Sequence, residues 1–321
     1  MQSTRIVEML EVTEAAALAA GRWMGKGDRH GADNAAVEGM RSAFNHVGID
    51  GTIVIGEGER DEAPMLFIGE KVGCGGERID IAVDPLEGTN LTADGQSNSL
   101  AVLAFGPEGS LLHAPDTYMN KVAVGPAAAD AVHIDLSPTE NIRNVAKALK
   151  RPVEDIVVCI LQRERHRDLI AEVRAAGARI RLITDGDVFG AVATAIEGTG
   201  IHLYLGTGAA PEGVLACTAM KCLGGCFMGR FAWRSEEEKQ RAVQMGTPHI
   251  DGILEMDTLV NTDEAAFIAT GVTDGELLRG VKYFGKGSRT HSITMQSSTG
   301  TVRFVETVHR TGADKFWVRM D

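Results

Sequence analysis

The sequence of 321 residues contains no long apolar run. None approaches the roughly 18 residues that a membrane-spanning helix requires, and the N-terminus lacks the charged and then apolar pattern of a secretory signal. We therefore expect a cytoplasmic protein with no membrane partner. Internal repeats, low-complexity tracts and long linkers are also missing, which argues against repeat and disordered architectures.

Basic residues are scarce relative to acidic ones, with 32 Lys and Arg against 44 Asp and Glu and a formal net charge of -12. A nucleic acid would be repelled by such a chain, so we expect no nucleic-acid partner. An anionic substrate would have to be attracted by the site itself. The hydrophobic content of 44% is enough to bury one large core or two joined ones.

Cysteines are few and odd in number: Cys74, Cys159, Cys217, Cys222 and Cys226. We expect free thiols, with Cys159 in the core and Cys74 exposed in a glycine-rich turn. Cys222 and Cys226 are four residues apart, but no second Cys or His pair at zinc spacing accompanies them. A structural zinc site is therefore not expected.

The glycine-rich stretches lack the spacing of nucleotide-binding loops, although 38 glycines produce chance matches. Residues 280–286 nearly match a phosphate-binding loop, but Gly287 stands where that motif needs Ser or Thr. Residues 25–31 and 206–213 do not follow the dinucleotide-binding spacing in a strand-turn-helix context. Neither a P-loop nor a nicotinamide site is expected.

The strongest local signal is a cluster of oxygen-bearing side chains directly after the apolar run 79–83. Its sequence is Asp84-Pro85-Leu86-Glu87-Gly88-Thr89. Pro85 cannot continue a sheet ladder and Gly88 frees the backbone, so we expect a sharp turn that gathers two carboxylates and a hydroxyl. Such an oxygen shell suits Mg²⁺ or Mn²⁺. The alternative is an ordinary strand-to-helix turn in which Glu87 and Thr89 cap the helix.

Further acids follow other apolar runs. Glu57 comes after the run 52–55 and Glu212 after the run 201–205, while Asp33 opens an expected helix. Asp33 taken alone suits a helix N-cap, but acids at the ends of several strands indicate one shared cleft.

The apolar periodicity predicts two α/β lobes, 1–150 and 151–321. Helices are expected at 7–20 and 33–46, and a capping box at 137–140 begins a helix that ends near residue 150. Short runs between 99 and 124 suggest hairpin-like strands. Strand and helix then alternate, which predicts a largely parallel segment: 156–161, 165–176, 178–183, 187–197, 201–205 and 211–223.

Six blocks, in this order, resemble the class II fructose-1,6-bisphosphatases, which belong to the lithium-sensitive phosphatase superfamily with the inositol monophosphatases. They are Gly27-Asp28 through Asp33, Gly56-Glu57-Gly58-Glu59, Asp84 to Thr89, Arg165-His166, Asp185-Gly186-Asp187 and Ala210-Pro211-Glu212-Gly213. The resemblance spans residues 5 to 310. It implies an α/β fold, a layered α-β-α-β-α sandwich with the active site between two lobes. The tail around 280–298 is similar to the cyanobacterial-type members, some of which also act on sedoheptulose-1,7-bisphosphate.

The resemblance also implies a catalytic set that uses two or more Mg²⁺ or Mn²⁺ ions. Asp33 and Glu57 would hold one ion, and a second would be held by Asp84, Glu87 and Glu212. Thr89, together with Asp33, would hydrogen-bond the attacking water and orient it.

Substrate-binding residues are implied in the same way. Arg163 and Arg165 would clamp the phosphate that does not react, and Arg29, where the family commonly has Lys, would reach the one that does. Glu164 stands where the family usually has Pro. Besides Glu87, Gly88 and Thr89, the residues implied at the sugar are Tyr118, Asp185, Gly186, Asp187 and Ala209. Helix capping is an alternative role for Asp187.

The implied function is hydrolysis of the 1-phosphate of fructose-1,6-bisphosphate in gluconeogenesis, by a homodimer or homotetramer, with sedoheptulose-1,7-bisphosphate as a second substrate. Two alternatives stay open. One is an inositol-type or other small-alcohol monophosphatase. The other is a sugar-phosphate-binding regulator without catalysis.

Overall fold

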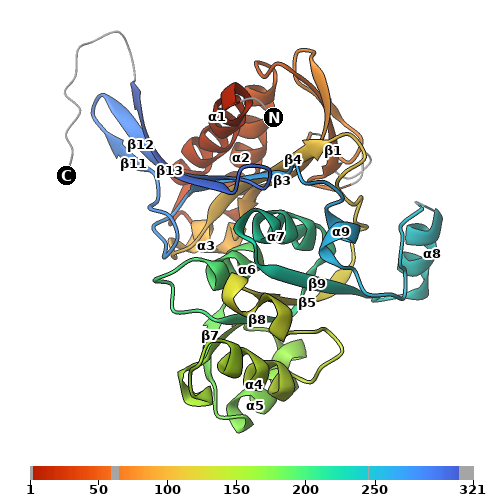
Figure 1. Cartoon of the computed structure of the whole chain (residues 1–321). Helices are drawn as coiled ribbons and strands as arrows, with labels where there is room; N and C mark the ends of the chain where they lie inside the picture. The colour runs from red at the N-terminus through yellow and green to blue at the C-terminus, as the bar shows by residue number, and fades with distance from the viewer. Residues whose placement is uncertain (1–2, 59–64, 245, 311–321) are drawn as a thin grey trace.

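The computed structural model describes residues 3–58, 65–244 and 246–310. Two β-sheets lie one above the other in Figure 1, with helices outside each sheet and between them. Among the described residues, no helix is both long enough and apolar enough to cross a membrane.

The first sheet has the strand order β11-β12-β10-β4-β3-β1-β2, and β13 pairs with β12. Strands β1 and β3 are parallel, and the other pairs are antiparallel. The strands are β1 (Ile49–Ile55), β2 (Lys71–Val72), β3 (Glu77–Glu87), β4 (Leu100–Pro107), β10 (Ala266–Gly271), β11 (Lys282–Phe284), β12 (Gly287–Gln296) and β13 (Thr301–Arg310).

The second sheet has the order β7-β6-β8-β5-β9. Its strands are β5 (Tyr118–Val124), β6 (Val157–Leu161), β7 (Arg179–Ile183), β8 (Leu203–Ala209) and β9 (Cys226–Ala232). Strands β7, β6 and β8 are parallel, as the strand and helix alternation predicted, whereas β5 is antiparallel to both of its neighbours.

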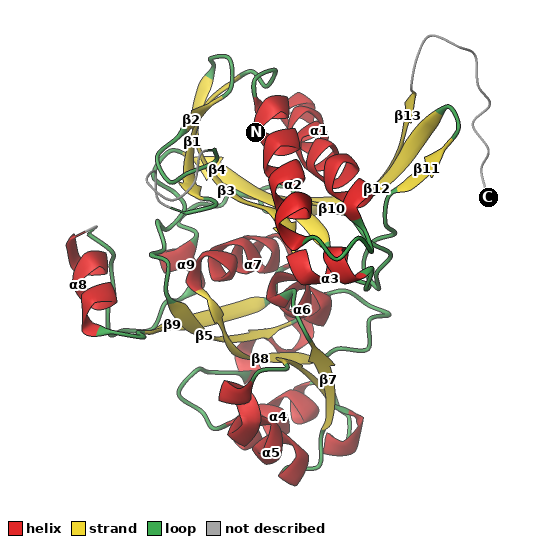
Figure 2. Cartoon of the chain, turned by 180° about the vertical axis from the view of Figure 1, so that it is seen from behind, coloured by secondary structure: helices red, strands yellow, loops and turns green. Residues whose placement is uncertain are grey.

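Six of the helices that the structure describes form three layers, and α8 stands to the side of them (Figure 1 and Figure 2). Helices α1 and α2 cover the outer face of the first sheet, α6 and α7 lie between the sheets, and α4 and α5 cover the outer face of the second (Figure 2). The bounds are α1 (Ser3–Ala20), α2 (Arg29–Phe44), α3 (Thr89–Asp94), α4 (Pro138–Ala148), α5 (Arg167–Ala175), α6 (Asp187–Val192), α7 (Ala210–Leu223), α8 (Glu236–Gln244) and α9 (Met256–Leu259).

Three hydrophobic clusters correspond to these layers. In β4, alternate residues point to opposite faces: Leu100 and Val102 join the cluster between the sheets, whereas Ala101 and Leu103 pack against α1 and α2. A third cluster fills the space between the second sheet, α4 and α5. The α-β-α-β-α sandwich predicted from the sequence is confirmed.

The expected helices and strands from residue 137 to 223 are confirmed within a few residues. Helix α4 begins at the predicted capping box, where the Ser137 hydroxyl accepts from the Glu140 amide and the Glu140 carboxylate accepts from Ser137. Helix α7 ends at Gly224, whose φ of 71° is left-handed and suits glycine. All five cysteines are free, and Cys74 is exposed while the others are buried, as expected.

The prediction of hairpin-like strands between 99 and 124 is wrong. Strand β4 pairs with β3 and β10 in the first sheet, whereas β5 pairs with β8 and β9 in the second. The two strands are adjacent in sequence but lie in different sheets. The division between the sheets also does not coincide with the proposed lobe boundary at residue 150, because β5 precedes it and β10 to β13 return to the first sheet.

Candidate active site

The oxygen-rich segment after residue 83 is the last part of a strand and the start of a helix. Strand β3 continues through Asp84 to Glu87, so Pro85 does not end the strand as expected, and the sharp turn is at Gly88. Asp84 pairs with Val102 and Glu87 with Leu100, which leaves one extra residue on β3, a bulge that accommodates the proline. Gly88 has φ +81° and precedes α3, which has no side-chain N-cap bond. The alternative that Glu87 and Thr89 serve as caps is therefore wrong.

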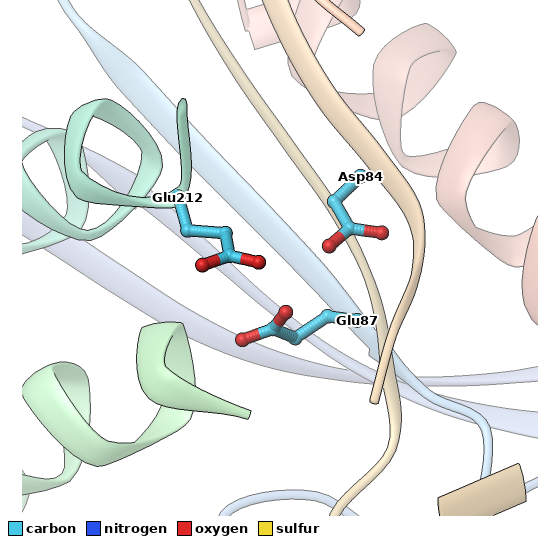
Figure 3. A group of neighbouring side chains, drawn as sticks. All are labelled: Asp84, Glu87 and Glu212. Carbon is cyan, nitrogen blue, oxygen red and sulfur yellow. The ribbon is translucent and has the colours of Figure 1, made fainter. Parts of the chain in front are cut away.

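Three carboxylates converge between the two sheets. Asp84 and Glu87 come from β3, Glu212 comes from the first turn of α7, and all three point toward one another in Figure 3. One oxygen of each lies within 4.8 Å of one oxygen of each other residue. This spacing lets a single cation contact all three side chains.

Each of these carboxylates is fixed by a backbone amide through one of its oxygens. The Oδ1 of Asp84 accepts from the Leu86 amide at 3.0 Å and Glu87 Oε1 accepts from the Val188 amide at 2.9 Å. Glu212 Oε2 accepts from the Ala209 amide at 3.1 Å. These three amides hold the side chains in the orientation in which they point toward one another (Figure 3). The bond to Val188 also joins the first sheet to α6.

Burial raises the pKa of Asp84, Glu87 and Glu212 well above the ordinary values, and the neighbouring carboxylates raise it further. One buried and two half-buried acids with mutual repulsion are costly unless a positive charge joins them. Hard carboxylate oxygens are the donors that Mg²⁺ and Mn²⁺ prefer. The donor set therefore fits the divalent metal that the resemblance implies.

Asp33 and Glu57 line the same cavity from α2 and from the segment after β1. Burial, and then the charge of Asp33, raise the pKa of Glu57 to about 7. Thr89 Oγ1 lies 3.4 Å from Asp33 Oδ1 and 3.0 Å from the Leu86 carbonyl oxygen. Asp28, and not Asp33, is the N-cap of α2, so the capping alternative for Asp33 is wrong. Glu59 lies outside the described residues.

The carboxylates line a cavity of about 420 Å³, and a second cavity of about 200 Å³ adjoins it. The two cavities share Asp185, Gly186, Ala209 and Glu212 in their walls. Gly88 and Thr89 line the first cavity only. Tyr118, Arg163, Arg165 and Asp187 line the second.

The second cavity has a basic and aromatic wall. The Arg165 guanidinium lies 4.6 Å from the centre of the Tyr118 ring, and Arg234 lies 5.2 Å from the same ring. Arg165 donates from Nε and Nη2 to the Thr207 carbonyl oxygen at 3.0 and 2.7 Å. The guanidinium is thus held on a face by Tyr118 and along its Nε and Nη2 edge by Thr207, which fixes its orientation for recognition of a phosphate.

Asp185 is already engaged by the protein. Its Oδ1 pairs with Arg163 and its Oδ2 accepts from the side-chain nitrogen Nδ2 of Asn90 at 2.8 Å. It therefore links α3 to the turn that carries Arg163. Glu164, in the family's proline position, is exposed and pairs with Arg167.

Of the predicted substrate-binding residues, Arg29 lies outside both cavities and Asp187 is buried in the wall of the second. Arg29 is the first residue of α2, is exposed and lines neither cavity. Asp187 begins α6 behind Gly186, which has φ +89°, and its carboxylate is almost completely buried. The N-cap residue of α6 is Gly186, and no side-chain capping bond is present at this helix start, so Asp187 does not cap the helix.

Lys121 and His166 hold the site together, and neither was predicted as a site residue, although His166 belongs to one of the six blocks. Lys121 lies in β5 between the buried Met119 and Ala123, and its Nζ is 2.6 Å from Asp187 Oδ2. A lysine directly before the apolar run Val122 to Val124, within one strand, was the available signal. His166 is buried, with Nδ1 2.7 Å from the Leu161 carbonyl oxygen and Nε2 accepting from the Thr207 amide at 2.8 Å. Its ring is therefore neutral, and it fixes the turn that precedes α5.

The layered sandwich, the carboxylate cluster between its sheets and the adjoining arginine-lined cavity define an α/β phosphatase. Comparison with known proteins agrees. Residues 3–309 match the family model described as bacterial fructose-1,6-bisphosphatase, glpX-encoded. This chain belongs to that family.

The chain is similar to proteins named D-fructose 1,6-bisphosphatase class 2/sedoheptulose 1,7-bisphosphatase. It is 48% identical over 328 residues to the protein of Synechococcus sp. (strain JA-2-3B'a(2-13)), with 94% of each chain covered. The protein of Synechocystis sp. (strain ATCC 27184 / PCC 6803 / Kazusa) is 47% identical over 334 residues, covering 96% of this chain and 97% of its own.

Proposed function

We propose that the protein hydrolyses the 1-phosphate of fructose-1,6-bisphosphate to give fructose-6-phosphate and phosphate, and that it also accepts sedoheptulose-1,7-bisphosphate. The observation that carries the proposal is the pair of adjoining cavities, one lined by carboxylates and the other by arginines. A sugar with a phosphate at each end has one group for each cavity. The printed names of the relatives support the same two substrates.

In this proposal Asp84, Glu87 and Glu212 hold one Mg²⁺ or Mn²⁺ ion, while Asp33 and Glu57 hold another. The support is the converging carboxylate oxygens and the backbone amides that fix them. Bound metal would neutralise charge on the phosphoryl oxygens and lower the pKa of the attacking water.

The chain's own groups orient the reactants. Thr89 Oγ1, 3.4 Å from Asp33 Oδ1, hydrogen-bonds the attacking water and directs it at phosphorus in line with the leaving sugar oxygen. Asp33 holds the hydroxyl in that direction. Both residues line the carboxylate cavity.

The sugar and the second phosphate lie in the adjoining cavity. Arg165 and Arg163 bind the phosphate that stays on the sugar, and Asp187 and the backbone of Gly186 and Ala209 contact the sugar hydroxyls. Tyr118 supports the guanidinium of Arg165 through its ring face. Arg29 is retained as a contact to the reacting phosphate, which requires its side chain to turn toward the cavity once substrate binds.

The experiment that tests this function measures phosphate release with Mg²⁺, Mn²⁺ or chelator. The substrates are fructose-1,6-bisphosphate, sedoheptulose-1,7-bisphosphate, fructose-6-phosphate and inositol-1-phosphate. We expect metal-dependent turnover of the bisphosphates and little turnover of the monoesters. A preference for the monoesters would favour a small-alcohol monophosphatase, and binding without turnover would favour a non-catalytic regulator.

We also propose a cytoplasmic homodimer or homotetramer, as the resemblance implies. The five free cysteines are consistent with a reducing compartment. Light scattering at several protein concentrations tests the assembly, and a single particle with the mass of one chain would refute it.

A further inference from the structure

Lys121 is a buried cation beside the acidic cluster. Its side chain is 1% exposed, and its Nζ lies 2.6 Å from Asp187 Oδ2 and 3.8 Å from Glu212 Oε2. It is carried by β5, which lies between β8 and β9 in the second sheet. A buried ammonium group is costly unless it is paired, so its position is determined by the two acids that it faces.

Lys121 contacts one oxygen of Asp187 and leaves the other free. Asp187 Oδ2 also lies 3.3 Å from the Tyr204 hydroxyl, which donates to it. Asp187 Oδ1 is buried and has no hydrogen-bond partner within the described part of the chain. An unpaired buried carboxylate oxygen costs free energy, which a ligand hydroxyl would recover by donating to it.

The same ammonium lies near the oxygen of Glu212 that accepts from the Ala209 amide. Asp187 and Glu212 oppose each other electrostatically, since after burial the charge of Asp187 is the largest cause of the raised pKa of Glu212. A cation that faces both acids reduces this repulsion and holds both in place.

The backbone around the pair leaves no room for it to move. A Cβ atom at Gly208 would lie 1.9 Å from Asp187 Oδ2 and 3.1 Å from Lys121 Nζ. At Gly213 it would lie 2.7 Å from Met119 Sδ and 3.4 Å from Lys121 Cε. These two glycines let β8 and α7 close directly over the ion pair, so its geometry is fixed by packing.

We propose that Lys121 is a positioning residue that aims the free oxygen of Asp187 at a sugar hydroxyl while it holds Glu212 in the metal cluster. It acts through these two acids and does not touch the substrate. The inference rests on the proposed function, in which Asp187 contacts the sugar. It links sugar recognition to the metal site through one side chain.

The test uses Lys121→Met, which keeps the length of the side chain but removes its charge. Lys221→Met is the matched control, because Lys221 is also largely buried and pairs with an acid, Asp257 at 2.7 Å, but Asp257 lines neither cavity, unlike the two acids that Lys121 faces. Calorimetry measures binding of fructose-6-phosphate to each protein in the presence of chelator, and a bisphosphatase assay then measures KM and kcat.

We expect Lys121→Met to weaken fructose-6-phosphate binding by about tenfold or more, the scale of one hydrogen bond to a charged group. Asp187→Asn should weaken fructose-6-phosphate binding by a similar factor. The double variant should bind no more weakly than the single variant with the larger loss, because the two residues act as one unit. Lys221→Met should bind as the wild type does. KM should rise by the same factor as the loss of binding.

Two outcomes would overturn the proposal. One is a Lys121→Met protein that melts earlier but binds the sugar phosphate normally, since the lysine would then be structural only. The other is a double variant whose loss equals the product of the two single losses. If Lys121→Met does not fold, Lys121→Gln carries the same expectation with a neutral polar group. If the wild type binds fructose-6-phosphate but shows no metal-dependent phosphate release, the proposed function is refuted. The comparison of the single and double variants would still test the role of Lys121.

Discussion

The stability of the metal-free protein should depend on pH through Glu57, whose pKa is raised to about 7 by burial and by Asp33. An unfolded glutamate titrates near its ordinary value of 4.5. The folded form therefore holds its proton more tightly, and the associated stability is fully present below about pH 4.5. It is lost as the pH rises through about 7.

The magnitude follows from the shift. A change of about 2.5 pKa units corresponds to about 3 kcal/mol at 1.36 kcal/mol per unit, and this is an upper figure because the side chain is partly exposed. For a chain of this size about 3 kcal/mol lowers the melting temperature by roughly 6 °C. Bound metal should remove most of this loss, since a cation favours the ionised carboxylate.

The assay is calorimetric melting between about pH 5 and pH 8, with excess chelator or with saturating Mg²⁺. We expect the difference in melting temperature between metal-loaded and metal-free protein to grow as the pH rises. Glu57→Gln is the control, since it removes this titration and should make the metal-free profile less steep, while the slope due to Asp84, Glu87 and Glu212 remains. Equal pH slopes for the wild type and Glu57→Gln in chelator would refute the reasoning.

Four further predictions concern separate parts of the molecule. Thr89→Ala should lower kcat about a hundredfold with an unchanged melting temperature, because an orienting hydroxyl is lost, while Thr89→Ser should keep most activity in the same phosphate-release assay; equal losses in both variants would count against the hydroxyl. Arg165→Ala should raise KM for the bisphosphate by about tenfold to a hundredfold, and Arg165→Lys should recover only part of the loss, as initial rates against substrate will show. Phe44→Ala, at a fully buried position between the first sheet and α2, should cost about 3–5 kcal/mol in denaturant unfolding without changing KM. Burial lowers the pKa of His166. Its neutral ring therefore supports stability above its unfolded pKa of about 6.5, and this support is lost as the pH falls through the folded value. The melting temperature of metal-loaded protein should fall more steeply below about pH 6.5 in the wild type than in His166→Gln.

The acidic blocks could be located from sequence because each is a local pattern. Glu57 and Glu212 each follow an apolar strand and Asp84 lies near the end of another, and these strand ends meet at one cavity. The end of the strand was expected at Pro85, but a bulge lets Pro85 remain in β3 and the turn follows at Gly88. That outcome depends on the partner strand, which the local sequence does not contain.

Strand partnership was the main feature that the sequence did not reveal. Strand β4 is buried on both faces and β5 is buried over most of its length, so neither carries a polar alternation that would mark its sheet. Pairing of β4 with β10 joins residues more than 150 positions apart, as in the register of Leu100 with Gly271. Lys121 was missed for the same reason, because its role depends on Asp187 and Glu212 from other elements.

The second sheet is inserted into the first. All of its strands lie between β4 and β10, which are hydrogen-bonded neighbours in the first sheet. A ribosome makes the chain from the N-terminus, so the second sheet can be complete while β4 still has one unpaired edge. Residues 84, 87 and 212 have all left the ribosome before β10 is made. Strand β4, the neighbour of β3, gains its second hydrogen-bonded partner only when β10 arrives. The active-site walls are therefore synthesised first, and the strand that completes their support is synthesised late.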